Sequence, residues 1–209
     1  MSADERRARM VERQLRRRGI DDERVLAAMG RVPRELFVPE ELRPEAYADA
    51  ALPIGGDQTI SQPFMVALIC ELLALQGHER VLDVGTGSGY QAAVLAELAA
   101  EVHTIERLPR LAERARENLA AAGYAGRLHL HVGDGTQGLP EHAPFQAIAV
   151  AAAASELPQA LYDQLVPGGR LVLPLGPVSS QRLEVVVRTP EGPATLRSVP
   201  CRFVPLIAG

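Results

Sequence analysis

The stretch VLDVGTGSGY, residues 81–90, decides the fold of this chain. An apolar strand over residues 81–85 runs into a loop that contains Gly85, Gly87 and Gly89. Glycine suits such a loop because the backbone there approaches a ligand closely and a Cβ would collide with it. A dinucleotide-binding loop has the spacing G-x-G-x-x-G, and Tyr90 holds the place of its third glycine. The spacing therefore excludes the pyrophosphate-binding form of the loop.

Strands and helices alternate after this loop. Strands are expected at residues 102–106, 127–132, 145–150 and 170–176, and helices at 90–100, 108–122 and 158–165. Alternation of this length favours a parallel, doubly wound sheet with helices on its faces. The last segments, 182–188 and 194–206, are strand-like and fit an antiparallel hairpin at the sheet edge. We therefore predict an α/β fold with a doubly wound, mostly parallel Rossmann-like sheet, a C-terminal antiparallel hairpin and N-terminal helices.

The region ahead of the glycine loop combines helices with one polar loop. Residues 3–30 have a helical pattern that Gly19 breaks into two, and residues 64–75 form a strongly apolar helix. Between them lies PIGGDQTISQP, residues 53–63, which is bounded by prolines and rich in hydroxyl and amide groups. Its composition predicts an ordered turn-forming loop that is neither helix nor strand, and polar loops of this kind often carry function.

Composition and charge narrow the choice of partners. With 209 residues the chain has room for one substantial core. Its formal net charge of -4 and the lack of a basic tail argue weakly against a nucleic-acid partner. The N-terminus has no apolar signal region and no run of apolar residues is long enough to span a membrane, so we expect a cytoplasmic protein that acts away from membranes.

The cysteines and histidines do not indicate a metal site. Cys70 and Cys201 have neither metal-ligand spacing nor a disulfide framework. His129 and His131 share one face of an expected strand and could bind a metal, but no third or fourth ligand is apparent, so a pair of strand-face histidines is favoured. The other histidines stand alone in the sequence, and we expect no metal; they are His78, His103 and His142.

Three carboxylates follow three successive strands. Asp83 lies two residues before the first glycine of G-x-G-x-G, an arrangement that resembles the loop of S-adenosylmethionine-dependent methyltransferases. That cofactor carries an ammonium, a sulfonium, a ribose diol and an adenine, so acidic side chains suit it. Glu106 is placed to accept both ribose hydroxyls, and Asp134 to meet the adenine amino group. Any one of them could be an exposed loop acid, but three at the carboxyl ends of strands favour a binding site.

Further motifs narrow the class of methyltransferase. LPIGGDQTISQP (52–63) is the most specific, and it is joined by GDG (133–135), APF (143–145), PGGRLVLPLG (167–176) and RFVPL (202–206). With these motifs nearly the whole chain resembles protein-L-isoaspartate O-methyltransferases. The resemblance implies methyl transfer from S-adenosylmethionine to the α-carboxylate of L-isoaspartyl residues in damaged proteins and peptides. The ester then cyclises without enzyme to a succinimide, whose hydrolysis returns some normal aspartate.

The resemblance also implies a set of site residues. Ser61 matches the active-site serine, and Gln58, Thr59 and Ile60 match the loop that meets cofactor and substrate. Gln181 matches a glutamine near the cofactor, in a region where loop lengths vary. Cofactor positions are matched by Asp83, Gly85, Glu106, Asp134 and Gly135, with Gly87 and Gly89 completing the glycine loop.

We expect a single monomeric domain over residues 1–209. It divides into an N-terminal helical cap (1–52), an active-site loop (53–63), a cofactor-binding α/β core (64–181) and a C-terminal hairpin (182–209). Two other functions stay open, namely methylation of aspartate in a dedicated peptide and S-adenosylmethionine binding without catalysis.

The role of Ser61 has two interpretations. A carboxylate substrate is already ionised at neutral pH, so its attack on the methyl group needs orientation and no general base. Ser61 can orient that carboxylate by a hydrogen bond, or it can merely close a turn or cap the helix that follows.

Three positions depart from the family pattern. Gln146 replaces a usual aspartate, which removes a charge that we expect near the cofactor side of the sheet, and Ala151 stands near a usual threonine or glycine. Asp57 stands where glycine is common and would bring an anion close to an anionic substrate. Either its side chain turns to solvent or the substrate preference has shifted.

Overall fold

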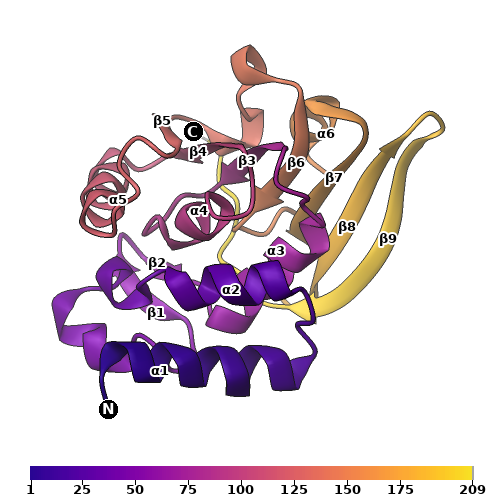
Figure 1. The fold of residues 1–209 in the computed structure, drawn as a ribbon. Coiled ribbons are helices and arrows are strands. Elements are labelled where there is room, and N and C mark those ends of the chain that lie inside the picture. The colour runs from indigo at the N-terminus through magenta and orange to yellow at the C-terminus, as the bar shows by residue number, and fades with distance from the viewer. Residues whose placement is uncertain (209) are drawn as a thin grey trace.

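A seven-stranded sheet forms the centre of the computed structural model, which describes residues 1–208 (Figure 1). Its strand order is β5-β4-β3-β6-β7-β8-β9, parallel from β5 to β7 and antiparallel from β7 to β9. The predicted doubly wound sheet with an antiparallel C-terminal hairpin is confirmed. The strands are β3 (Arg80–Val84), β4 (Glu101–Glu106), β5 (His129–Val132), β6 (Phe145–Val150), β7 (Leu165–Leu175), β8 (Gln181–Thr189) and β9 (Gly192–Cys201).

Capping residues set the ends of the N-terminal helices. The Ser2 hydroxyl accepts a hydrogen bond from Glu5 N at 3.1 Å and starts the first helix. Gly19, at φ 89°, closes the segment, and Asp22 caps the second helix, so the predicted break at Gly19 is confirmed. The helices are α1 (Ala3–Met10), α2 (Glu23–Arg31), α3 (Pro63–Leu73), α4 (Tyr90–Leu95), α5 (Pro109–Ala121) and α6 (Gln159–Asp163).

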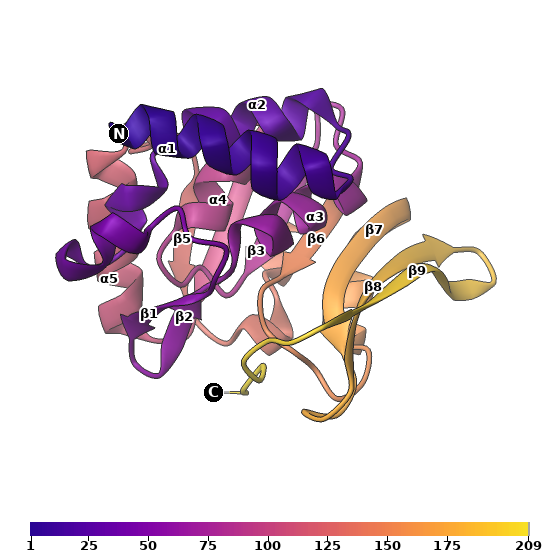
Figure 2. The same cartoon turned by 90° about the horizontal axis from the view of Figure 1, so that it is seen from below.

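Short 3-10 and π segments join the longer elements. A π-helical stretch, η1 (Val11–Leu15), continues α1, and η2 (Arg16–Arg18) follows it. Figures 1 and 2 show α1 and α2 side by side over α3 and α4, so the N-terminal residues cover one face of the sheet. The other short segments are η3 (Arg34–Phe37), η4 (Glu40–Glu45), η5 (Gly135–Gln137) and η6 (Pro140–His142).

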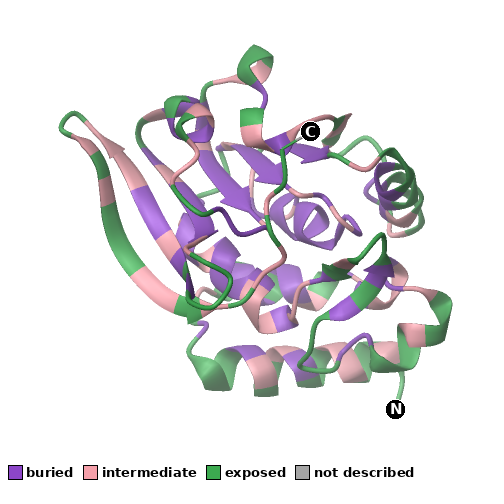
Figure 3. Ribbon diagram, turned by 180° about the vertical axis from the view of Figure 1, so that it is seen from behind, coloured by how far each residue is buried: buried purple, intermediate pink, exposed green. Residues whose placement is uncertain are grey.

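The central strands of the sheet, β3, β4 and β6, are buried on both faces, whereas the edge strands β5 and β9 are partly exposed (Figure 3). Along β3, Val81 belongs to a large apolar cluster with the N-terminal helices, and Leu82 and Val84 belong to a second cluster on the other face. The same division separates alternate residues of β6. Because strands buried on both faces need apolar residues throughout, this packing explains the near-continuous apolar runs in the sequence.

The region expected to be an irregular loop is a β-hairpin. Strands β1 (Leu52–Gly55) and β2 (Gln58–Ile60) pair antiparallel, with Leu52 opposite Ile60. Gly56 and Asp57 form the turn at φ 60° and 57°, and positive φ at both central residues is what a two-residue type I′ hairpin needs. The prediction that this segment is not a strand was wrong, because its glycines and polar residues hid two short strands.

Other predicted boundaries shift by a few residues. β7 begins at Leu165, well before the predicted start, so Pro167, Gly168 and Gly169 lie inside the strand. α4 ends at Leu95, and the residues that follow it form turns. Among residues 1–208, no helix is long and apolar enough to cross a membrane.

Candidate active site

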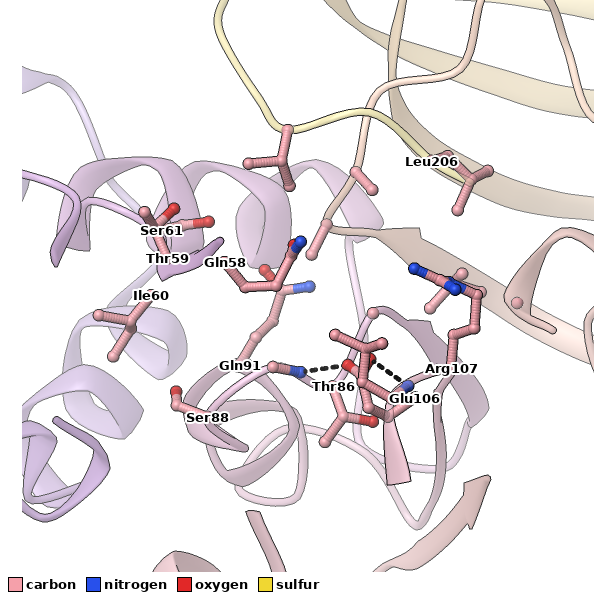
Figure 4. A pocket seen from close by; sticks show the side chains of 18 of the residues that line it. Gln58, Thr59, Ile60, Ser61, Thr86, Ser88, Gln91, Glu106, Arg107 and Leu206 are labelled. Carbon is pink, nitrogen blue, oxygen red and sulfur yellow. Dashed lines mark hydrogen bonds between the residues drawn. The ribbon is translucent and has the colours of Figure 1, made fainter. Parts of the chain in front are cut away.

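A cavity opens at the carboxyl ends of β3, β4 and β6, the edge at which parallel α/β sheets bind ligands. The glycine loop forms its floor, and Ala151, which follows β6, lies in its wall. The β1–β2 hairpin closes one side, and residues 204–207 of the C-terminal segment close the other. Figure 4 shows Ser61 and Glu106 on opposite sides of this cavity.

Glu106 is fixed at the end of β4 by two backbone donors. Its Oε2 accepts a hydrogen bond from Gly87 N at 2.9 Å, and its Oε1 accepts one from Leu108 N at 3.0 Å (Figure 4). Each carboxylate oxygen has two lone pairs, so both oxygens keep acceptor capacity toward the cavity. Glu106 lines the cavity, as predicted, in a position that suits a pair of hydroxyl donors.

Asp83 lies below the cavity and outside its lining. The side chain is fully buried, and its oxygens accept hydrogen bonds from Gln91 Nε2 and Thr104 Oγ1, both at 2.8 Å. Burial raises the pKa of Asp83 to about 6. Thr104 also shares a hydrogen bond of 2.6 Å with Thr86, which lines the cavity together with Gln91. Through these hydrogen bonds Asp83 fixes Gln91 directly and Thr86 by way of Thr104, and both of these residues line the cavity.

The glycines of the loop serve two different purposes. Gly85 and Gly87 line the cavity at φ 92° and 55°, as the sequence predicts. Gly89 does not line it, and a Cβ there would lie 3.1 Å from Leu119 Cγ. The third glycine is thus explained by its backbone conformation, with φ at 92°, and by its close packing against α5, without a direct contact to a ligand.

Two further predicted cofactor residues lie outside the lining. Asp134 caps η5, where its Oδ1 accepts hydrogen bonds from Thr136 N and Oγ1, while the neighbouring Gly135 lines the cavity. Gln181 bonds to the backbone of Phe203, accepting at 2.6 Å and donating at 3.2 Å. Gln181 therefore does not line the cavity itself. It holds Phe203 in place, and the residues that follow Phe203 close the cavity.

Ser61 lies in the cavity wall with its hydroxyl unpaired among residues 1–208. The N-cap of α3 is Gln62, which makes no side-chain capping bond, so the structure does not use Ser61 to cap that helix. Thr59 is exposed, Gln58 and Ser61 are half-buried, and Ile60 is buried; all four line the cavity, as predicted. Their common position brings the TIS motif opposite the glycine loop.

Arg34 holds the segment that contains Ser61, residues 58–62, here called the Ser61 loop. The sequence did not predict this role. Its Nη2 donates to Ser61 O and its Nε to Ala46 O, both at 2.8 Å, and its guanidinium lies 4.7 Å from the Tyr90 ring centre. Arg34 is fully buried, and this burial lowers its pKa to about 10, so it stays cationic at neutral pH. A single arginine in the apolar segment VPRELF is the signal that could have identified it.

Two of the three departures from the family pattern, Gln146 and Asp57, lie outside the lining of the cavity. Gln146 sits at the amino end of β6, where its Oε1 accepts from Arg80 N at 2.8 Å, so the expected place near the cofactor was wrong. Asp57 is exposed at the hairpin turn and does not line the cavity. Its side chain turns to solvent, which removes the conflict with an anionic substrate. Only Ala151 lies in the cavity wall.

This sheet and the site at its carboxyl edge define a Rossmann-like methyltransferase. The family model for protein-L-isoaspartate(D-aspartate) O-methyltransferase matches residues 5–209, and the chain belongs to that family.

Relatives and solved structures agree with this assignment. The chain is 57% identical to protein-L-isoaspartate O-methyltransferase of Methanoculleus marisnigri, with 96% of this chain and 91% of the relative covered. It is 56% identical to the enzyme of the same name from Methylorubrum populi, with 99% and 97% covered. The crystal structure of a Plasmodium falciparum homologue in complex with S-adenosyl-L-homocysteine superposes with a TM-score of 0.85 at 29% identity, covering 96% of this chain and 98% of that one.

Proposed function

We propose that this chain transfers a methyl group from S-adenosylmethionine to the α-carboxylate of L-isoaspartyl residues in damaged proteins and peptides. The ester formed in this way starts repair through a succinimide. The observation that carries the proposal is the cavity at the carboxyl edge of the sheet, where the Ser61 loop faces the Glu106 carboxylate. The family of the chain supports the reaction and the substrate class.

The residues of the cavity fit the cofactor. Gln91 Oε1 is a buried acceptor without a partner among residues 1–208, and Gln91 lines the cavity. A buried acceptor of this kind favours a ligand that donates a hydrogen bond to it, because leaving it unpaired costs about 1–3 kcal/mol. Glu106 would hold the ribose hydroxyls, and Gly85 and Gly87 allow the ligand to approach the backbone.

The protein's part in the reaction is orientation. Bound S-adenosylmethionine supplies an electrophilic methyl group, and the isoaspartyl carboxylate supplies the nucleophile in its ionised form. We propose that Ser61 Oγ, for which residues 1–208 provide no hydrogen-bond partner, donates a hydrogen bond to one carboxylate oxygen and aims the other at the methyl group. Arg34 holds the Ser61 backbone in place through its carbonyl. Proximity and alignment of this kind can contribute about 7–11 kcal/mol in favourable cases.

We further propose a cytoplasmic monomer that acts on protein and peptide substrates, away from nucleic acids and membranes. Both cysteines are free, as expected in a reducing compartment, and the net charge of -4 gives no general attraction for nucleic acid. Sedimentation at several concentrations measures the oligomeric state, and a dimer at all of them would contradict this part.

A methylation assay tests the reaction. Matched isoaspartyl and aspartyl peptides are incubated with labelled S-adenosylmethionine, and we expect methyl transfer to the isoaspartyl peptide alone. Ser61→Ala should lower kcat/KM by about 10–100-fold, since loss of alignment at a reacting centre has this magnitude. Ser179→Ala, at an exposed serine outside the cavity, is the matched control and should keep full activity.

Two outcomes contradict the proposal at different levels. No methylation of the isoaspartyl peptide by folded, cofactor-binding protein would refute the reaction. Full activity of folded Ser61→Ala would refute the orienting role and leave the reaction intact.

A further inference from the structure

Four of the five histidines gather on β4, β5 and η6, outside the lining of the cavity. His103 lies on β4 opposite His129 of β5, and His131 is two residues further along β5 on the same face. His142, at the end of η6, packs its ring 4.4 Å from that of His103 and 4.8 Å from that of His131. The expectation that His103 and His142 stand alone was therefore wrong, because the parallel register and η6 bring them together.

The nitrogen atoms of three of these rings have the spacing of metal ligands. His103 Nδ1 and His131 Nε2 are 3.1 Å apart, and one ligand atom from each of His103, His131 and His142 lies within 4.8 Å of the others. Two imidazole nitrogens at 2.0–2.1 Å from a tetrahedral Zn²⁺ are about 3.3 Å apart. The first pair already has this separation, and the half-exposed His142 supplies a third nitrogen within 4.8 Å of the other two.

A carboxylate fixes the orientation of the central histidine. His103 Nε2 lies 2.8 Å from Glu101 Oε1, and Arg80 Nε donates to the other oxygen of Glu101 at 2.8 Å. An anionic Glu101 accepts the Nε2 proton of His103, which leaves Nδ1 as the unprotonated nitrogen that faces His131. Histidines that bind metals commonly donate their other ring N–H to a carboxylate in this way, and such outer partners orient the ring.

We propose that His103, His131 and His142 form a Zn²⁺ site, with Glu101 as a positioning residue. Imidazole is a preferred ligand of Zn²⁺, and the half-exposed side of the cluster leaves room for a water as the fourth ligand. On binding, the proton of His131 moves from Nε2 to Nδ1, so the ring keeps its neutral charge.

The site is structural and separate from methyl transfer. His103 and Glu106 lie three residues apart on β4, which places the histidine about 10 Å from the end of the strand that meets the cavity. β5 is the edge strand of the sheet, and η6 leads into β6. A metal ion bound by β4, β5 and η6 would therefore hold this edge strand to the loop across it.

Metal titration tests the site. Chelator-treated protein is titrated with ZnCl₂ by calorimetry, and we expect one Zn²⁺ per chain and a higher midpoint of thermal unfolding with Zn²⁺ than with chelator. His142→Ala, at a half-exposed position, should weaken Zn²⁺ binding more than 100-fold, which exceeds the roughly 10–100-fold cost of losing an outer partner. Glu101→Gln should fall within that smaller range. Circular dichroism checks that each variant is folded.

Two histidine controls make the assignment specific. His78→Ala removes a histidine outside the cluster, and His129→Ala removes one that could form a different group with Glu101 and His103. Both should retain the wild-type affinity for Zn²⁺. The absence of stoichiometric Zn²⁺ binding, undiminished binding by His142→Ala, or loss of binding by His129→Ala would overturn the proposal.

Discussion

Arg34→Met removes the buried cation that holds the Ser61 loop, and its cost can be worked from the structure. Two backbone carbonyls, of Ala46 and Ser61, lose their donor, at about 1–3 kcal/mol each. The contact with the Tyr90 ring adds about 1 kcal/mol. These losses are partly offset because the variant no longer buries a charge. Burial lowers the pKa of Arg34 from 12.5 to about 10, and this shift corresponds to an unfavourable free energy of about 3 kcal/mol that the variant avoids. We expect a net loss of stability of about 2 kcal/mol.

The effect on catalysis should exceed the effect on stability. Without its anchor the Ser61 carbonyl can shift, and a displacement of about 1 Å at a reacting centre can cost about 100-fold in rate. We therefore expect kcat/KM for an isoaspartyl peptide to fall about 10–100-fold at a temperature where the variant is folded. Urea unfolding measures the stability, and the methylation assay measures kcat/KM.

Arg24→Met is the matched control for this experiment. Arg24 also donates to two backbone carbonyls, Leu75 O at 2.5 Å and Leu98 O at 2.9 Å, but it has no contact with the Ser61 loop. It should lose stability and keep its kcat/KM. If folded Arg34→Met and Arg24→Met had the same kcat/KM, the anchoring role of Arg34 would be refuted.

Two further predictions concern residues next to the cavity. The pKa of Asp83 is raised to about 6 by burial, against about 3.9 in an unfolded chain, so its contribution to stability is present at pH 4 and lost as the pH rises through 6. The free energy of unfolding of Asp83→Asn, measured by urea titration, should thus rise by up to about 3 kcal/mol relative to that of the wild type between pH 4 and pH 7. A difference between the two proteins that does not change with pH would contradict this. Gln181→Leu removes both hydrogen bonds to Phe203 and so loosens the cavity wall at residues 204–207. The KM for S-adenosylmethionine should rise about tenfold with kcat unchanged. An unaltered KM would show that the Gln181 bonds do not shape the cavity.

Features encoded by neighbouring residues were predictable from the sequence. The strand before Gly85, the alternation that follows it and the break at Gly19 depend on local periodicity and on glycine, and the structure confirms them. The position of Glu106 at the end of a strand was predictable for the same reason, and the structure places it in the cavity lining, while its role toward a cofactor stays a prediction.

Features that depend on distant pairing were not predictable. The contact between Arg34 and Ser61 joins positions 27 apart, and that between His103 and His131 joins positions 28 apart. Gly89 shows a second reason why the sequence was insufficient. A glycine can be needed for ligand binding or for packing, and only the position of Leu119 in the structure shows that Gly89 packs against α5. Asp134 and Gln181 lie near the cavity but do not line it. The lining residues are Gly135, which follows Asp134, and residues 204–207, which follow the Phe203 that Gln181 holds.

The β1–β2 hairpin has a consequence for how the protein folds. Two paired strands have little stability alone, so this wall of the cavity takes its order from its tethers. Arg114 of α5 donates to Ile54 O at 3.1 Å, and Arg34 of η3 donates to Ser61 O directly after β2; the hairpin also buries Leu52, Ile54 and Ile60 in the larger apolar cluster. The tethers belong to the α/β core and to the N-terminal cap, so both must be in place before the wall forms. The shape of this wall therefore depends on the packing of both the N-terminal cap and α5, so we expect changes in either of them to alter S-adenosylmethionine binding.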